Sequence, residues 1–265
     1  MNRGDWEDVH AAVRWLDARA PTVGGTVSLI RQGMRATLWL DHVEARNAIS
    51  TSMMCDLATH LGEFLFEDTP TTLVIRSRHA GAFCAGGNLK QVGPYLSQPD
   101  AGARMCRAMQ QLLNVVLDGP WVSVAVVEGA AVGGGAELCT ATDFRLMTPE
   151  AVVAFRQVAL GVAAGWGGAG RLVRHVGRSQ ALAWLAGART LTVHEMHEAG
   201  FCTQTCDVEG VETALDAMLS PFERLDPGAV AAAKRQVVAG ERGDLSAERA
   251  AFLSVWGGPG HRVGR

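Results

Sequence analysis

The chain has 265 residues, of which 48% are hydrophobic and 19% charged, with a formal net charge of −3 at pH 7. A chain of this length and apolar content can bury a large core without disulfides or a structural metal. The weakly acidic balance argues against a general binder of nucleic acids or membrane surfaces, because both functions need basic patches.

The first 20 residues predict an amphipathic helix, because four large apolar residues recur at helical spacing: Trp6, Val9, Val13 and Leu16. Several acidic residues and the lack of a long apolar stretch lead us to expect neither a secretory signal nor a membrane span here. The six cysteines form no CxxC pair and lie near no histidine cluster. We therefore expect reduced thiols, no bound metal and a cytoplasmic location.

The next part of the chain alternates between strand and helix patterns. Residues 26–41 predict a hairpin that turns at Gln32-Gly33. Strands are expected at residues 71–78, 121–129 and 143–148, helices at 51–65 and 101–119, and a glycine-rich loop at 80–89. Repetition of strand, loop and helix predicts an α/β protein with parallel strand pairing.

From about residue 190 the pattern becomes helical. Three amphipathic segments, each bounded by glycine or proline, occupy residues 192–200, 211–219 and 227–240. We therefore divide the chain into an N-terminal helix (1–20), a core (22–202) and a C-terminal helical region (203–265).

The segment "AVGGGAELC", residues 131–139, places three glycines between a buried strand and a helix. Backbone N–H groups at a helix start have no partner inside the helix, so they can receive an anion or a developing oxyanion. A tight turn and an oxyanion site are both open interpretations. A phosphate is the least favoured guest, because Glu137 stands where a phosphate loop of the Walker type needs Lys and Ser or Thr.

Two strand-and-glycine-loop segments, "VIRSRHAGAFCAGGNL" (74–89) and "VAVVEGAAVGGGAEL" (124–138), resemble the enoyl-CoA hydratase/isomerase, or crotonase, superfamily. The segment "EARNAIS" (44–50) and residues 165–201 extend the likeness, which runs from about Val27 to Trp256. The resemblance implies a crotonase-like spiral of ββα units with a C-terminal helical trimerisation region. It also implies an acyl-CoA thioester as substrate, no separate cofactor, and a homotrimer or hexamer.

The resemblance further implies where the substrate lies. The thioester oxygen would accept hydrogen bonds from the N–H groups of Gly87 and Gly134. Coenzyme A would lie along Ala45, Arg46 and the first glycine-rich loop, with its residues Ala85, Asn88 and Leu89. Asn88 departs from the family, because most members have aspartate there. Lys234 and Arg235 are either further phosphate contacts or a solvated helix face.

Related hydratases use two glutamates, one after the glycine run and one about twenty residues later. Glu137 matches the first, but Gln157 occupies the second position. An amide neither accepts nor delivers a proton at neutral pH, which disfavours a hydratase and weakens the case for an isomerase. Loss of CO₂ from a malonyl-type thioester needs no such base. The segments "GGGAEL", "DFRLMTPE" and "GWGG" look like those of short-chain alkylmalonyl-CoA decarboxylases.

Several roles stay open at this point. Glu137 is expected to give the enolate its proton or to orient a water that does, or else simply to favour the dipole of its helix. Arg156 or Gln157 is expected either to contact the substrate carboxylate or to have a structural role, because alternation cannot tell which of them faces inward. Trp166 is either a wall of the acyl pocket or core packing. The alternatives to decarboxylation are a hydratase or isomerase, or a non-catalytic protein that binds acyl-CoA or RNA.

Overall fold

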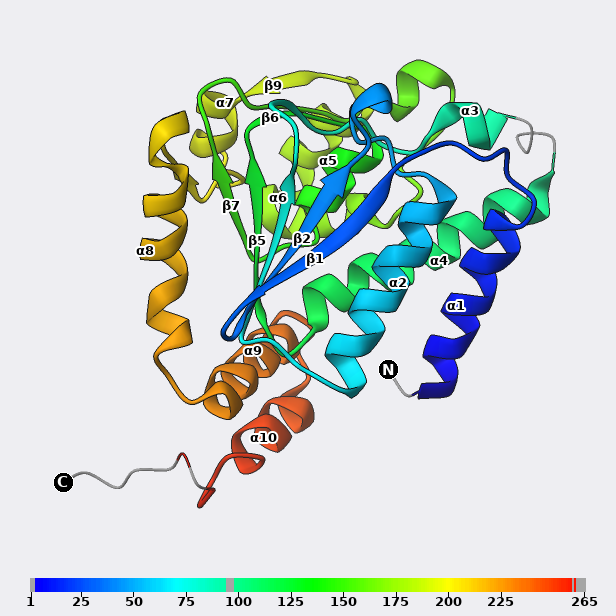
Figure 1. Cartoon of the computed structure of the whole chain (residues 1–265). Helices are drawn as coiled ribbons and strands as arrows, with labels where there is room; N and C mark the ends of the chain where they lie inside the picture. Colours follow the sequence, from blue (N-terminus) through cyan, green and yellow to red (C-terminus); the bar gives the residue numbers. More distant parts are fainter. Residues whose placement is uncertain (1–2, 94–97, 259, 261–265) are drawn as a thin grey trace.

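The computed structural model describes residues 3–93, 98–258 and 260 (Figure 1). Its larger sheet has six strands in the order β1-β2-β3-β5-β7-β10. The strands are β1 (Thr26–Gln32), β2 (Arg35–Asp41), β3 (Thr72–Ser77), β5 (Val122–Val127), β7 (Phe144–Met147) and β10 (Gln204–Thr205). The predicted hairpin is confirmed, since β1 and β2 are antiparallel with Gln32 opposite Arg35. All the other pairs in this sheet are parallel, as the alternation predicts.

A second sheet of four strands was not predicted. Its order is β4-β6-β8-β9, with β4 (Gly81–Cys84), β6 (Gly129–Val132), β8 (Val152–Ala154) and β9 (Thr190–Thr192). β4 lies inside the segment predicted to be only a loop, and β6 begins at Gly129, where the predicted strand 121–129 was expected to end. Both are short and rich in glycine and alanine, so pairing rather than propensity makes them strands. β4 and β6 run parallel, which brings the loops that follow them together.

Helices cover the larger sheet on both faces (Figure 1). On one side lie α1 (Arg3–Asp17), α2 (Thr51–Phe66) and α4 (Pro99–Asp118), and α8 (Val211–Glu223) lies on the other side. The remaining α-helices are α3 (Leu89–Val92), α5 (Gly134–Cys139), α6 (Gly168–Ala186), α7 (Val193–Glu198), α9 (Pro227–Glu241) and α10 (Leu245–Leu253). Short 3₁₀ turns are η1 (Val43–Ala45), η3 (Gln157–Leu160) and η4 (Val208–Gly210).

The N-terminal helix is confirmed together with the face it buries. The four apolar residues predicted to form that face, Trp6, Val9, Val13 and Leu16, are the buried residues of α1. Within α2, Gly62 has no room for a side chain, because a Cβ there would lie 2.3 Å from Nε1 of Trp6. The N-terminal helix α1 therefore packs closely on α2.

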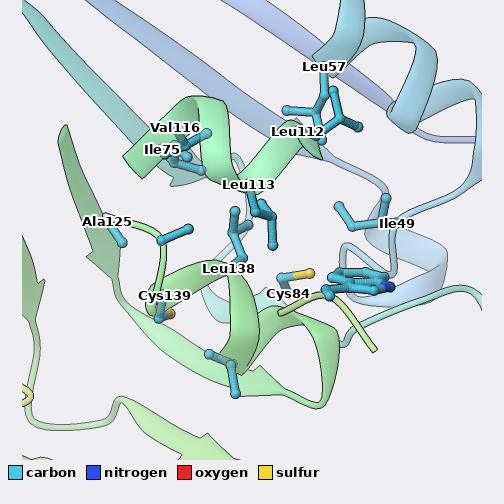
Figure 2. Close-up of a cluster of buried hydrophobic side chains, with 14 of the residues drawn as sticks. Ile49, Leu57, Ile75, Cys84, Leu112, Leu113, Val116, Ala125, Leu138 and Cys139 are labelled. Atoms are coloured by element: carbon cyan, nitrogen blue, oxygen red, sulfur yellow. The ribbon is translucent and has the colours of Figure 1, made fainter. Parts of the chain in front are cut away.

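The main core lies between the larger sheet and the helices α2, α4 and α5. Figure 2 shows side chains of these elements, together with Ile49 ahead of α2 and Cys84 of β4, gathered in one cluster: Ile49, Leu57, Ile75, Cys84, Leu112, Leu113, Val116, Ala125, Leu138 and Cys139. A smaller cluster on the opposite face of the sheet joins β3, β5 and β7 to α8 through Val74, Val124, Val126, Leu146, Val211, Leu215 and Leu219. All six cysteines are free. The core therefore needs no covalent cross-link.

The C-terminal helices α7, α8 and α9 confirm the three amphipathic segments predicted from residue 192 onward. α9 and α10 lie beyond one end of the larger sheet (Figure 1). β10 pairs with β7 just past residue 202, so the larger sheet extends beyond the predicted end of the core. The three-part division and a role in trimer formation stay predictions. No helix among the described residues has the length and apolar content needed to cross a membrane.

Candidate active site

The two glycine-rich loops meet at the ends of β4 and β6. A Cβ built on Gly86 would lie 2.9 Å from the carbonyl oxygen of Val132 and 3.0 Å from the nitrogen of Gly134. Residues 86–87 of the first loop are therefore close neighbours of residues 133–134 of the second. The parallel pairing of the two strands, which are separated by more than 40 residues in the chain, produces this proximity.

Each glycine of the triple run meets a different constraint. Gly133 has a φ of +56°, a conformation that side chains disfavour. A Cβ on Gly134 would lie 2.4 Å from Cζ3 of Trp166, and one on Gly135 would lie 2.0 Å from the carbonyl oxygen of Cys84. The run is thus more than a tight turn, since two of its members are needed for close approach.

Trp166 is the side chain that faces both loops. Its indole ring has an atom 3.5 Å from a Cβ built on Gly87, and other atoms of the same ring meet Gly134. The residue is only 4% exposed. In the described part of the chain, the N–H groups of Gly87 and Gly134 make no backbone hydrogen bond between elements. The structure thus brings together three residues that the sequence placed at the site.

The carboxylate of Glu137 is buried, at 1% exposure, and accepts four hydrogen bonds. Oε1 accepts from Gln157 Nε2 at 2.9 Å and from the Gly165 nitrogen at 3.2 Å. Oε2 accepts from the nitrogens of Trp166 and Gly168, each at 2.8 Å. Gly168 is the first residue of α6, so the carboxylate also lies at the positive end of that helix.

Burial raises the pKa of the Glu137 carboxyl, while the hydrogen bonds from Gly168, Trp166 and Gln157 act in the opposite direction. The charge of Arg171 also favours the ionised form. Burial lowers the pKa of this arginine to about 10, so it keeps its positive charge at neutral pH. The carboxylate therefore has hydrogen-bond donors at both oxygens and a buried cation nearby.

The structure distinguishes Arg156 from Gln157, which the sequence could not. Gln157 reaches Glu137, and its own Oε1 is buried with no hydrogen-bond partner in the described structure. Arg156 is exposed and donates to the carbonyl of Ala188 at 3.3 Å. Gln157 is therefore the member of the pair that lies at the carboxylate.

The segment expected to hold coenzyme A lies beside the first loop. Ala45 ends η1, and Arg46 follows in a left-handed conformation with its carbonyl accepting from Ala85 at 3.0 Å. Asn88 is buried and caps α3 by accepting from the Lys90 nitrogen at 3.1 Å. Leu89 is 62% exposed. Asn88 thus has a structural role, whereas Leu89 presents its side chain to solvent.

Asn47 is a residue that sequence reasoning missed. It is fully buried, and its Oδ1 accepts from the His42 nitrogen at 2.8 Å. Its Nδ2 donates to Ser77 Oγ at 2.7 Å and to the carbonyl of Phe83 at 3.2 Å. The side chain ties residues 42–47 to β3 and β4, and so fixes the segment next to the first loop. Asn47 has a left-handed φ of 56°, which asparagine tolerates better than most residues. This preference was the sequence signal that could have identified Asn47.

Lys234 and Arg235 differ in what they contact. Lys234 is buried and its ammonium pairs with Asp143 inside the chain. Arg235 is exposed and donates to Ser254 Oγ at 3.2 Å. A solvated helix face is therefore wrong for Lys234, and contact of Lys234 or Arg235 with a phosphate of coenzyme A stays a prediction.

The chain is similar to known proteins over most of its length. Residues 33–258 match the family model described as enoyl-CoA hydratase/isomerase. An ethylmalonyl-CoA decarboxylase of Danio rerio is 37% identical over 247 residues, which cover 89% of this chain and 81% of that protein. The human protein of the same name is 33% identical over 244 residues, covering 89% and 79%.

Solved structures agree in fold. An enoyl-CoA hydratase from Bacillus anthracis superposes with a TM-score of 0.82 at 22% identity, covering 88% of this chain and 92% of that one. An enoyl-CoA hydratase/isomerase from Marinobacter aquaeolei gives a TM-score of 0.80 at 26% identity with the same coverage. The family match spans most of the chain, and the fold and the paired glycine loops agree with it. The chain belongs to the enoyl-CoA hydratase/isomerase family.

Proposed function

We propose that the protein decarboxylates a small alkylmalonyl-CoA, such as methylmalonyl-CoA or ethylmalonyl-CoA. The observation that carries this proposal is the pair formed by Glu137 and Gln157, because an amide stands where a hydratase needs its second carboxylate. Relatives that share 30–37% of their residues with this chain are named ethylmalonyl-CoA decarboxylase, which supports the same assignment. An acyl-CoA substrate is consistent with membership of the enoyl-CoA hydratase/isomerase family.

In the proposed reaction, the bond between the α-carbon and the free carboxylate of the substrate breaks. Its electron pair passes into the thioester as an enolate, and CO₂ leaves. The N–H groups of Gly87 and Gly134 would donate to the enolate oxygen, and donors of this type are worth about 3 kcal/mol each. A proton from water then joins the α-carbon, so the products are the acyl-CoA, CO₂ and hydroxide.

Two catalytic roles are expected for Glu137: to give the enolate its proton, or to orient a water molecule that does. The hydrogen bonds of its carboxylate favour the second role over direct proton donation. An ionised carboxylate that accepts four hydrogen bonds has no proton to give, and a protonated one would need an acceptor among its neighbours. Gln157 is the neighbour that could supply an acceptor, by rotating its amide. Trp166 is proposed to bound the acyl group, because its ring lies against both glycine loops.

The remaining assignments follow the family. We propose that Ala45, Arg46 and Ala85 lie along coenzyme A and that no further cofactor takes part. A homotrimer or hexamer would cover apolar side chains near the C-terminus, such as Phe252 and Trp256, which are 45% and 62% exposed. Their rings are in contact, with centroids 5.0 Å apart.

A substrate panel tests the proposal. The purified protein would be mixed separately with methylmalonyl-CoA, ethylmalonyl-CoA and crotonyl-CoA, and the acyl-CoA products followed by mass. We expect loss of CO₂ from at least one malonyl thioester and no hydration of crotonyl-CoA above the protein-free control. Hydration of crotonyl-CoA without decarboxylation would overturn the proposal in favour of a hydratase. Binding of all three without turnover would favour a non-catalytic acyl-CoA protein.

A further inference from the structure

We propose that Glu137 is a positioning residue whose ionised carboxylate fixes the loop of residues 165–168, and that this loop holds the Trp166 ring against Gly87 and Gly134. The inference rests on the proposed function only for its effect on turnover. The placement of the ring is a property of the protein without substrate.

The first step is the source of the hydrogen bonds to Glu137. Three of its four donors are backbone nitrogens of one short loop: Gly165, Trp166 and Gly168. Charge-assisted hydrogen bonds of this kind are about twice as strong as neutral ones. One buried side chain of α5 therefore determines the path of the loop on both sides of the tryptophan.

The second step is that the same loop is also held by its carbonyl groups. The carbonyl of Gly165 accepts from Gln110 Nε2 of α4 at 3.1 Å, and the carbonyl of Trp166 accepts from Arg171 Nη2 at 2.6 Å. Arg171 also donates to the backbone carbonyl of Glu137 at 3.5 Å. Since both N–H and carbonyl groups of the loop are bonded, the backbone that carries the indole ring is fixed on both sides of Trp166.

The third step concerns room around the loop. A Cβ on Gly168 would lie 2.5 Å from Cγ of Glu137, and one on Gly167 would lie 2.9 Å from Nη1 of Arg171. Gly167 also has a φ of +81°. Gly167 and Gly168 therefore allow the backbone to pack directly on the guanidinium and the carboxylate, and the bulky side chain of "GWGG" is the one that faces the two loops.

The matched pair Glu137→Gln and Glu137→Ala tests the role. Glutamine keeps one oxygen to accept from Trp166 and Gly168, and Gln157 can turn its unpaired Oε1 toward the new amide. Alanine removes every acceptor. A positioning role therefore predicts that the glutamine variant keeps at least tenfold more kcat than the alanine variant, whereas a proton donor would be lost equally in both.

The position of the ring is measured separately, by ¹⁹F NMR of protein labelled with 5-fluorotryptophan and free of substrate. The chain has seven tryptophans, and the resonance of residue 166 is the one missing from Trp166→Phe. We expect Glu137→Ala to shift or broaden this resonance and Glu137→Gln to change it less. Gln110→Leu, which removes a loop anchor without touching the carboxylate, is expected to move the same resonance.

The outcomes separate the two proposals. If Glu137→Ala and Gln110→Leu leave the resonance of Trp166 at its wild-type position, the positioning role is overturned, whatever the activity. Equal loss of kcat in Glu137→Gln and Glu137→Ala with an unmoved ring would assign proton transfer to Glu137. A moved ring in a protein that decarboxylates no malonyl thioester would support the positioning role and refute the proposed function.

Discussion

Replacing Gly134 with alanine tests whether the Trp166 ring rests on this glycine. Gly134 does not have a positive φ, so the backbone accepts alanine without strain. The added methyl would lie 2.4–2.7 Å from three atoms of the indole ring, whereas ordinary van der Waals contact begins at 3.4 Å. The ring would therefore have to move by about 1 Å.

The size of the effect follows from how firmly the ring is held. Overpacking a well-packed core costs about 1–3 kcal/mol. The loop that carries Trp166 is bonded to both Glu137 and Arg171, so we expect the upper half of this range. With an unfolding entropy of about 2.1 cal/mol/K per residue, a loss of about 2–3 kcal/mol corresponds to a decrease in Tm of about 4–5 °C.

The assay is thermal unfolding followed by circular dichroism at fixed protein concentration. Gly87→Ala is the matched control, because its methyl would lie 3.5 Å from the same ring, and we expect its Tm to change by about 1 °C or less. Trp166→Leu removes the clashing ring, so the double variant with Gly134→Ala should be more stable than the sum of the single effects predicts. Equal Tm values for the two alanine variants, or strict additivity, would refute the reasoning.

Three further predictions concern buried polar groups. Burial lowers the pKa of His175 from 6.5 to about 4, so the unfolded chain binds more protons between these values. Stability should therefore fall by about 2 kcal/mol from pH 7 to pH 5, measured by urea unfolding. Lys234→Met leaves the carboxylate of Asp143 without its cation, and we expect a loss of about 3 kcal/mol in the same assay. Gln157→Glu places a second carboxylate against Glu137, which raises the pKa of the pair. Stability of this variant should fall as the pH rises, by about 2 kcal/mol more at pH 8 than at pH 5.

Each of these predictions has a control that keeps the shape of the site. His175→Gln should reduce the fall in stability between pH 7 and pH 5. An unchanged fall would mean that groups other than His175 cause it. The double variant of Lys234→Met with Asp143→Asn should recover part of the lost stability, whereas no recovery would mean that packing rather than charge was lost. The stability of Gln157→Leu should vary with pH as that of the wild type does. If its stability fell with rising pH as much as that of Gln157→Glu, interaction between the two carboxylates could not be the cause.

Long periodic segments allowed most of the fold to be predicted. The alternation around Gln32-Gly33 specified the hairpin, and the spacing of apolar residues in the first 20 positions specified α1 and its buried face. The strands β4 and β6 could not be predicted, because four residues rich in glycine and alanine carry little strand signal of their own. They form because each completes the other's hydrogen bonds.

The same limit applies to the site. The sequence indicated that Gly87 and Gly134 belong to paired loops, but it could not show that Trp166, more than 30 residues further along the chain, lies against both. Alternation in a three-residue strand ends too early to orient Arg156, which precedes the 3₁₀ turn η3, and Gln157, which begins it. Their directions depend on tertiary contacts that no local pattern encodes.

Glu137 shows most directly how local reasoning can identify the right interaction and the wrong partner. A carboxylate in the first turn of α5 was open to a simple interpretation, stabilisation by the dipole of its own helix. The carboxylate instead accepts from the nitrogen of Gly168, which begins α6 and lies 31 residues away. The helix dipole does act on Glu137, but it is that of α6. The consequence is functional as well as structural, because the charge that stabilises the start of α6 also holds the backbone of Trp166 next to the two glycine loops.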